Sequence, residues 1–295
     1  MTDKKKVLDR PLGVHISVAG GLYKGFERAE KYGCTAIQIF VKNQHRWKAR
    51  ELESEDIDKF LKEKERTGIF VFAHAAYLPN LASPEDDLWK KSLDEISFEL
   101  ERCDSLSIPY LIFHPGNYTS SSRDEGIDRI IEAIDKIYSN HDYNTQLVLE
   151  NTAGQGTSIG STFEEIGKIL RGSNFTKKLG LCYDTCHGFA AGYDIRSETT
   201  YKKMWDEFDS EIGMKFLRTI HLNDSMAEFG KHKDRHQNIG KGEIGIEGFR
   251  NILTDEKLKS IPIILETPKT RKTKKGKEID MHKVDFNKIV ELAFN

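Results

Sequence analysis

Eight short apolar segments recur along this chain, and stretches with helical periodicity or polar loops separate them. Strands that alternate with helices are joined by crossovers, and crossovers require a parallel sheet. Eight such units within 295 residues are the number found in a (β/α)8 barrel. The expected strands comprise residues 12–17, 36–40, 69–73, 110–113, 146–149, 179–183, 216–220 and 261–265. We therefore expect an α/β protein with the TIM-barrel fold.

The sequence indicates one domain. It contains no Pro-, Gly- or Ser-rich linker that would divide the chain. Its length fits one large barrel, and a hydrophobic content of 38% provides enough material for the core. We expect the single barrel domain to span residues 11–295. Residues 1–10 are polar, and we expect them to form a flexible N-terminal extension.

Hydropathy and charge exclude several classes of protein. No apolar run approaches the roughly 20 residues that a membrane span needs, and the N-terminus is too polar for a signal peptide. The four cysteines lie within or beside apolar segments, which is typical of buried thiols in a reducing compartment. We therefore expect a soluble intracellular protein, cytoplasmic or DNA-associated, without a membrane partner. A net charge of -2 gives no global sign of nucleic-acid binding.

A side chain able to bind a metal follows the last apolar residue of each of the third to eighth strands. These residues are His74, His114, Glu150, Asp184, His221 and Glu266. Parallel barrel strands all end on one face, where TIM-barrel enzymes keep their active sites. One such residue alone is typical of a turn cap or a hydrogen-bonded pair. Six in succession predict a metal site on that face.

Three further side chains extend this set. Asp234-x-His236 places two side chains on the same side of an extended segment, and His187 is the natural third ligand beside them. Imidazoles and carboxylates without thiolates favour zinc, manganese or iron over calcium or magnesium. Cys182 and Cys186 are not expected to bind zinc, because their spacing is not Cys-x-x-Cys and no second pair exists.

The number of candidate ligands predicts the chemistry. Nine exceed the three or so that one catalytic zinc ion needs, so the set implies at least two ions and has room for three. Ions about 3.5 to 4 Å apart stabilise both the attacking and the leaving oxygen of a displacement at phosphorus. The residues therefore predict phosphoester hydrolysis.

Several short motifs occur in order between residues 12 and 293. They are Gly13-x-His15-x-Ser17-x-x-Gly20-Gly21, Lys42-Asn43-Gln44, His74-x-x-Tyr77-Leu78, Leu149-Glu150-Asn-Thr-Ala-Gly, Cys182-x-Asp184-Thr-Cys-His187, His221-Leu-Asn-Asp224-Ser, Asp234-Arg-His236-x-Asn-Ile-Gly240-x-Gly242 and Leu265-Glu266-Thr-Pro268. As an ordered set they resemble the endonuclease IV family of zinc-dependent apurinic/apyrimidinic endonucleases. The resemblance implies cleavage of double-stranded DNA 5′ to an abasic site, leaving a 3′-hydroxyl and a 5′-deoxyribose phosphate. Trimming of blocked 3′ ends in base excision repair is a further expectation.

The resemblance also implies three zinc ions, with manganese able to replace zinc at one site. It assigns the ions to three sets of ligands: His74, His114 and a bridging Glu150; Glu150, Asp184, His221 and Glu266; and His187, Asp234 and His236. Glu150 and Glu266 are the expected catalytic carboxylates. The enzyme is expected to act as a monomer.

DNA recognition is expected from loops around the same face. An enzyme that acts on a nucleotide within a duplex must extrude it, which costs least where the base is missing. By resemblance, the loops after the second and third strands enter the minor groove. The expected DNA contacts are Asn43, Gln44, His45, Arg46, Tyr77, Leu78, Lys231 and Arg235.

The loop after the second strand departs from the family pattern. His45 stands where the family has an arginine, so either His45 or Arg46 is the intercalating residue. Trp47 belongs to the same loop, and it either contacts DNA or anchors the loop in the core.

A basic run follows the eighth strand at Lys269, Arg271, Lys272, Lys274, Lys275 and Lys277. It would rim the face that carries the metal ligands. Contacts to DNA phosphates are one interpretation, and a solvated surface is the other.

Two other classes of protein compete with this hypothesis. Sugar isomerases and epimerases on similar barrels need one metal, for which Glu150, Asp184, His221 and Glu266 suffice. They do not need the other five candidate ligands, and this surplus favours the nuclease. The third hypothesis is a DNA-binding protein that has lost catalysis, and it is disfavoured because every ligand position holds a competent residue. Metal content separates the first two: about three zinc ions against one divalent ion per chain.

Overall fold

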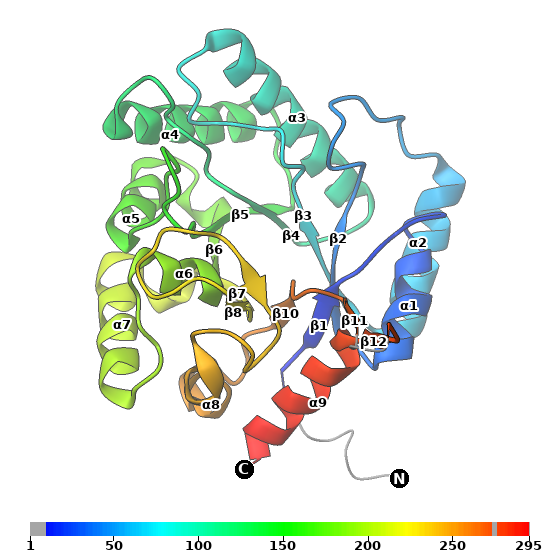
Figure 1. Ribbon diagram of the computed structural model, residues 1–295. Coiled ribbons are helices and arrows are strands. Elements are labelled where there is room, and N and C mark those ends of the chain that lie inside the picture. The colour runs from blue at the N-terminus through cyan, green and yellow to red at the C-terminus, as the bar shows by residue number, and fades with distance from the viewer. Residues whose placement is uncertain (1–9, 273–275, 295) are drawn as a thin grey trace.

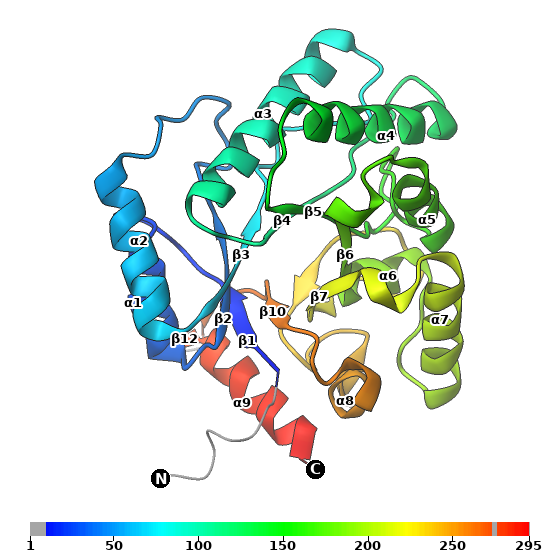
Figure 2. The same cartoon turned by 180° about the vertical axis from the view of Figure 1, so that it is seen from behind.

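The computed structural model describes residues 10–272 and 276–294. Eight parallel strands form a closed barrel in the order β1-β10-β7-β6-β5-β4-β3-β2. Helices surround these strands, as Figures 1 and 2 show from opposite sides. The expected TIM barrel is thereby confirmed. The expected N-terminal extension lies outside the described residues except for Arg10, which is buried and donates a hydrogen bond to Leu253 O.

All eight expected strands are present, each within two residues of its expected bounds. They are β1 (Leu12–His15), β2 (Ala36–Phe40), β3 (Phe70–His74), β4 (Tyr110–Phe113), β5 (Gln146–Glu150), β6 (Leu179–Asp184), β7 (Leu217–His221) and β10 (Ile263–Leu265). The helices are α1 (Lys24–Tyr32), α2 (Ser54–Thr67), α3 (Asp86–Ser105), α4 (Arg123–Asn140), α5 (Phe163–Gly172), α6 (Thr185–Ala191), α7 (Glu198–Glu211), α8 (Gly245–Thr254) and α9 (Met281–Phe294). Short 3-10 turns cover Thr176–Lys178, Met214–Phe216 and Glu256–Leu258.

The alternation of side chains along each strand divides the core into two layers. A small interior cluster consists of Ala36, Phe72, Ile112, Val148, Cys182 and Ile264. Residues at the intervening positions, such as Leu147 and Leu149, belong to the larger cluster between the strands and the helices. Gly13 permits β1 and β2 to approach, because a Cβ at this position would lie 1.6 Å from Ala36 O.

Three small features were not expected from the sequence. They are α6 and two short antiparallel hairpins, β8–β9 (Asp224–Ser225 with His236–Gln237) and β11–β12 (Thr270–Lys272 with Glu278–Asp280). Gly188 lies inside α6. A Cβ there would lie 2.3 Å from the Tyr183 hydroxyl oxygen, so close packing rather than a turn requires this glycine.

At the start of α5, Ser161 and Thr162 followed by Glu164 and Glu165 fit the sequence pattern of a capping box, and the structure contains half of it. Thr162 caps the helix by accepting a hydrogen bond from Glu165 N at 3.2 Å. The Glu165 carboxylate does not return to Thr162 N. It accepts hydrogen bonds from Gly160 N and Ser161 N instead, at 2.8 and 3.0 Å.

Candidate metal centre

The candidate ligands meet at one end of the barrel. His74, Glu150, Asp184 and His221 are the last residues of β3, β5, β6 and β7, and His114 and Glu266 directly follow β4 and β10. Parallel strands bring these six ends to the same face. The other three candidates reach this face from α6, which carries His187, and from the β8–β9 hairpin, which carries Asp234 and His236.

Three groups that contain only imidazoles and carboxylates offer closely spaced ligand atoms, and two further groups include a thiol. In each group every pair of ligand atoms lies within 4.8 Å. The three groups without a thiol are His74, His114 and Glu150; Glu150, Asp184, His221 and Glu266; and His187, Asp234 and His236. They coincide with the three sets of ligands that the family resemblance implies.

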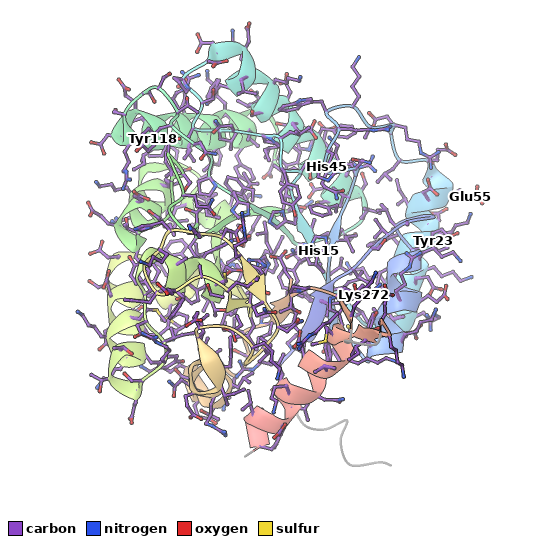
Figure 3. The ribbon with its side chains drawn as sticks, viewed as in Figure 1. His15, Tyr23, His45, Glu55, Tyr118 and Lys272 are labelled. Atoms are coloured by element: carbon purple, nitrogen blue, oxygen red, sulfur yellow. The ribbon has the colours of Figure 1, made fainter. Side chains whose placement is uncertain are left out.

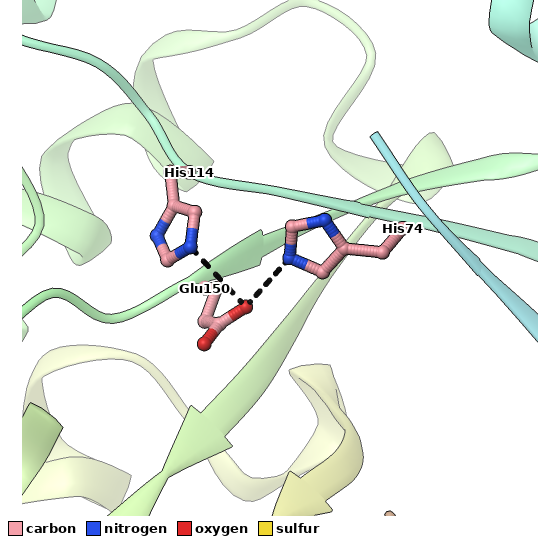
Figure 4. Close-up of side chains that lie close together, drawn as sticks. All are labelled: His74, His114 and Glu150. Carbon is pink, nitrogen blue, oxygen red and sulfur yellow. Dashed lines mark hydrogen bonds and ion pairs between the residues drawn. The ribbon is translucent and has the colours of Figure 1, made fainter. Parts of the chain in front are cut away.

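Glu150 occupies the centre of this arrangement and is fully buried. Its Oε2 lies 3.2 Å from His74 Nε2 and 3.9 Å from His114 Nε2, as Figure 4 shows. Its Oε1 lies 3.2 Å from the Nδ1 atoms of both His187 and His221. One carboxylate therefore faces two imidazoles with each oxygen, which is a geometry suited to bridging two ions.

Electrostatics keep this carboxylate ionised. Burial alone would raise the pKa of Glu150, but the neighbouring His221 and His114 hold it well below its ordinary value. Burial alone would lower the pKa of the His74 imidazole. The hydrogen bond to Glu150 and the negative charge of Glu150 outweigh this effect and raise the pKa of His74 above its ordinary value. The site thus stabilises negative charge on oxygen and positive charge beside it.

Each of three buried imidazoles uses one ring nitrogen to fix its orientation. His74 Nδ1 donates to Ala75 O at 2.8 Å, and His187 Nδ1 donates to Asn151 O at 2.9 Å. His221 Nε2 donates to the side-chain oxygen of Gln38 at 2.7 Å. The other ring nitrogen of each histidine is left to face carboxylates, which is the usual arrangement of metal-binding histidines.

Sequence reasoning missed the residues that hold the carboxylates. Asn223 donates to Asp184 Oδ2 at 2.6 Å and accepts from Glu266 N at 2.8 Å. Asn151 accepts from Asp184 N at 2.6 Å and donates to Asp184 O at 3.0 Å. Both asparagines follow a candidate ligand within two residues, and this proximity was the available signal.

Unsatisfied buried atoms test whether a metal fits. Glu150 Oε1, His221 Nδ1 and His236 Nε2 are buried and lack a hydrogen-bond partner among the described residues. Buried polar atoms in folded proteins nearly always have a partner. Three orphaned ligand atoms of the right chemical type within one cluster fit bound cations.

Two thiols also lie near the cluster. Cys182 lies with Glu150 and His221, and Cys186 lies with Asp184 and His236. Burial raises the pKa of each thiol to about 12, which disfavours the thiolate that binds metals. The imidazole and carboxylate groups remain the better candidates.

The structure brings together the two loops expected to contact DNA. Tyr77 N donates to Gln44 O at 3.3 Å, and the rings of His45 and Tyr77 lie 6.0 Å apart. Asn43, His45 and Arg46 are exposed, Tyr77 is 58% exposed, and Gln44 and Leu78 are half-buried. Figure 3 labels His45 on this rim and His15 nearer the barrel axis.

The remaining expected DNA contacts lie on the segment between β8 and β9. Lys231 and Arg235 are both exposed. Lys231 pairs with Glu228 at 3.6 Å, and Arg235 donates to Asp234 O at 2.7 Å. Their neighbour Asp234 joins Tyr77 in lining a cavity of about 810 Å³, which also includes Glu266 and His236.

The basic run begins at the cavity that Tyr77 also lines. Lys269 lines the cavity, and Arg271 and Lys272 are exposed on β11, where Figure 3 labels Lys272. Lys277 is also exposed, whereas Lys274 and Lys275 lie outside the described residues. The register places Lys272 opposite Glu278.

Comparisons with known proteins identify the family. Residues 26–283 match the family described as xylose isomerase-like TIM barrel. A probable endonuclease 4 from Halothermothrix orenii is 44% identical over 259 residues, which are 88% of this chain and 93% of the relative. The probable endonuclease 4 of Chloroflexus aggregans is 43% identical over 259 residues, or 87% and 91% of the two chains.

Solved structures agree with these relatives. Endonuclease IV from Thermus thermophilus superposes with a TM-score of 0.81 and 30% identity, over 96% of this chain and 98% of that one. A D-tagatose 3-epimerase-like protein shares the fold alone, with a TM-score of 0.71 and 19% identity over 96% and 98% of the chains. Among the described residues, no helix is long and apolar enough to cross a membrane. The family match, the two relatives and the Thermus thermophilus structure together show that the chain belongs to the endonuclease IV family of xylose isomerase-like TIM barrels.

Proposed function

We propose that this protein is a zinc-dependent DNA repair endonuclease. It hydrolyses the phosphodiester bond 5′ to an abasic site and leaves a 3′-hydroxyl and a 5′-deoxyribose phosphate. The same site trims blocked 3′ ends. We further propose that residues 11–295 form the catalytic domain and that the protein acts as a monomer inside the cell, with manganese able to replace one zinc ion.

The surplus of ligands is the observation that carries this proposal. A single ion needs only Glu150, Asp184, His221 and Glu266, which form one group within 4.8 Å. Two further groups with the same spacing adjoin it. Glu150 belongs both to this four-residue group and to the group with His74 and His114. A buried carboxylate that faces imidazoles with both oxygens supports a multinuclear centre.

When bound, these ions would act as Lewis acids that stabilise the attacking and leaving oxygens at phosphorus. The side chains of the protein supply the positioning. Glu150 and Glu266 would supply carboxylate oxygens as ligands. The Glu266 carboxylate is held in position by a hydrogen bond of 2.6 Å from the Gln38 side-chain amide. Burial of Glu150, Asp184 and His221 keeps water away from the inner side of the site.

Recognition of the lesion is proposed for the rim of the site. Tyr77 is an exposed aromatic beside His45, and both belong to loops at the mouth of the 810 Å³ cavity or next to it. A ring inserted where the base is missing stacks on the neighbouring base pairs and stabilises the extruded sugar. Asn43, Gln44, Arg46, Leu78, Lys231 and Arg235 are the further proposed contacts.

One assay tests the function. The purified protein, loaded with zinc, is incubated with a duplex that carries a single tetrahydrofuran abasic analogue and a label on the 5′ end. We expect one product whose length corresponds to cleavage directly 5′ to the analogue and whose 3′ end a DNA polymerase extends. An uncut duplex, or an equal rate of cutting in an intact duplex, would contradict the proposal.

The epimerase hypothesis has one observation in its favour, which is the shared fold of the D-tagatose 3-epimerase-like protein. It leaves His74, His114, His187, Asp234 and His236 without a role. Ketose epimerisation without cleavage of abasic DNA would decide in favour of this alternative.

A further inference from the structure

One face of α3 contacts both loops to which we assign DNA recognition. Lys91, Glu95, Glu99 and Arg102 follow one another at spacings of four, four and three residues, so they lie along one side of the helix. We call these four residues the α3 stripe. Glu95, Glu99 and Arg102 are buried. Charged side chains are rarely buried without a specific partner, so their contacts are informative.

The α3 stripe closes the loop between β2 and α2 at both ends. Arg102 donates from Nε and from one terminal nitrogen to Val41 O at 2.9 and 2.6 Å, and from the other to Arg50 O at 2.9 Å. One guanidinium therefore fixes the two ends of the segment that carries the expected DNA contacts.

The middle of the same loop is held by a lysine that points inward. Lys42 Nζ donates to Arg46 O at 2.5 Å and to Trp47 O at 3.0 Å, and it also pairs with Glu95. The Lys42 side chain is only 1% exposed, so it cannot contact DNA. Lys91 lies 4.1 Å from the centre of the Trp47 ring. The half-buried Trp47 ring therefore packs against α3.

The loop between β3 and α3 depends on the same stripe. Glu99 accepts a hydrogen bond from Ala76 N at 2.9 Å, directly before Tyr77. Ser92, one residue beyond Lys91, accepts from Asn80 N at 2.8 Å. Both loops are therefore tied to one rigid helix, and Tyr77 N joins them by its bond to Gln44 O.

We propose that the α3 stripe and Lys42 are positioning residues. They hold the two loops that contact DNA in fixed positions relative to each other before DNA binds. Preorganisation of this kind lowers the entropy lost on binding, so its removal weakens binding more than it slows the chemical step. This inference rests on the proposed function. It assigns control over affinity for abasic DNA to residues that touch neither DNA nor metal, all of them buried except Lys91.

The decisive variant removes the clamp without leaving a buried charge. Replacing Lys42 alone would leave Glu95 buried and unpaired, which destabilises the fold. The double variant K42M/E95L removes both charges and retains the bulk of both side chains. We expect its stability in urea to remain close to that of the unsubstituted protein. K178M is the matched control. Lys178 likewise pairs with a carboxylate, that of Asp142, and donates to a carbonyl oxygen, that of Tyr143, and both partners lie in the loop before β5.

Two measurements report on the loop. In K42M/E95L, trypsin should cut after Arg46 and Lys48 about tenfold faster, because the carbonyl anchors are removed. The KM for the abasic duplex should rise about tenfold, while kcat at saturating DNA stays within about twofold. K178M should match the unsubstituted protein in both. A similar substitution pair tests the second loop: E99L should raise KM, whereas E99Q, whose amide oxygen still accepts from Ala76 N, should not.

The outcomes distinguish the inference from the proposed function. If the unsubstituted protein does not prefer abasic over intact duplex, the proposed function fails and the inference falls with it. If that preference holds but K42M/E95L has unchanged proteolysis and KM, only the inference is overturned. A fall in kcat with an unchanged KM would also overturn it, because the stripe would then act on the metal centre instead of the loops.

Discussion

His221 donates from Nε2 to the side-chain oxygen of Gln38 at 2.7 Å, and this bond turns its Nδ1 toward Glu150 and Glu266. The amide nitrogen of Gln38 simultaneously donates to Glu266 Oε1 at 2.6 Å. One neutral side chain on β2 therefore orients both an imidazole at the end of β7 and a carboxylate directly after β10. Such partners of metal ligands tune affinity although they do not touch the ion.

Replacing Gln38 by leucine should weaken metal binding. The change removes both hydrogen bonds and keeps the volume, so His221 and Glu266 lose their fixed orientation. We expect zinc affinity, measured by competition with a coloured chelator, to fall by about 10- to 100-fold. Q146L is the control, since Gln146 begins β5 and bonds to Lys177 O and Arg218. Equal zinc affinity of Q38L and Q146L would contradict the role of Gln38.

Replacing Glu150 by glutamine should abolish cleavage and leave the fold intact. The amide cannot bridge two cations, so the loss of several kcal/mol of transition-state stabilisation should lower kcat by about a thousandfold or more. Thermal unfolding followed by circular dichroism checks the fold. E99Q serves as the control for a buried glutamate outside the three ligand groups. Retention of near-normal turnover by E150Q would remove its assigned role.

The basic run should contribute to DNA binding through phosphate contacts. The triple variant K269Q/R271Q/K272Q should weaken binding of intact and abasic duplexes alike. The slope of log K against log salt concentration should fall by about 1 for each phosphate that the variant no longer neutralises. The control K202Q/K203Q/K215Q removes three exposed lysines on and after α7, across the barrel from β11 in Figure 1. An unchanged slope in the first variant would identify the run as a solvated surface.

Stability should depend on pH through Glu99. Burial raises the pKa of this carboxyl to about 7, against about 4.5 for the unfolded chain. The folded state therefore binds a proton that the unfolded state has lost, so the contribution of Glu99 is complete below pH 4.5 and is lost as the pH rises to about 7.

Urea unfolding of the native protein and of E99Q isolates this contribution. Because glutamine does not titrate, E99Q should gain stability relative to the native protein between about pH 5 and about pH 8. The gain should approach about 1.4 kcal/mol for each pH unit between the two pKa values. If the unfolding free energies of E99Q and the native protein differ by the same amount at about pH 5 and at about pH 8, Glu99 ionises normally in the fold.

The barrel and the clustering of the candidate ligands at its strand ends could be predicted because their signals are local. An apolar run followed by His, Asp or Glu marks the end of a buried strand, and parallel strands bring such ends together. His74, Glu150, Asp184 and His221 needed no knowledge of distant residues. Gln38 was missed, although the sequence did contain a signal for it. It is a polar residue inside the apolar run Ala36–Phe40.

Other features were not predictable from local pattern. The strands of β8–β9 have two residues each and those of β11–β12 three, which is too short for an alternating pattern to be detected. The helix α6 contains Gly188 and has seven residues, and its cap is the side chain of Asp184, for which the sequence left a turn cap as the alternative to a metal ligand. The buried position of Lys42 could not be predicted because its partner Glu95 lies 53 residues away in the sequence.

The number of zinc ions bound per chain distinguishes a trinuclear centre from a mononuclear one. The protein, purified with zinc in the medium and freed of loosely bound metal, is analysed for metal per chain and crystallised for anomalous scattering at the zinc edge. The three ligand groups predict three zinc ions per chain, with two of them sharing Glu150. A single ion held by Glu150, Asp184, His221 and Glu266, with no scatterer beside His114 or Asp234, would contradict a trinuclear centre and favour an epimerase-like one.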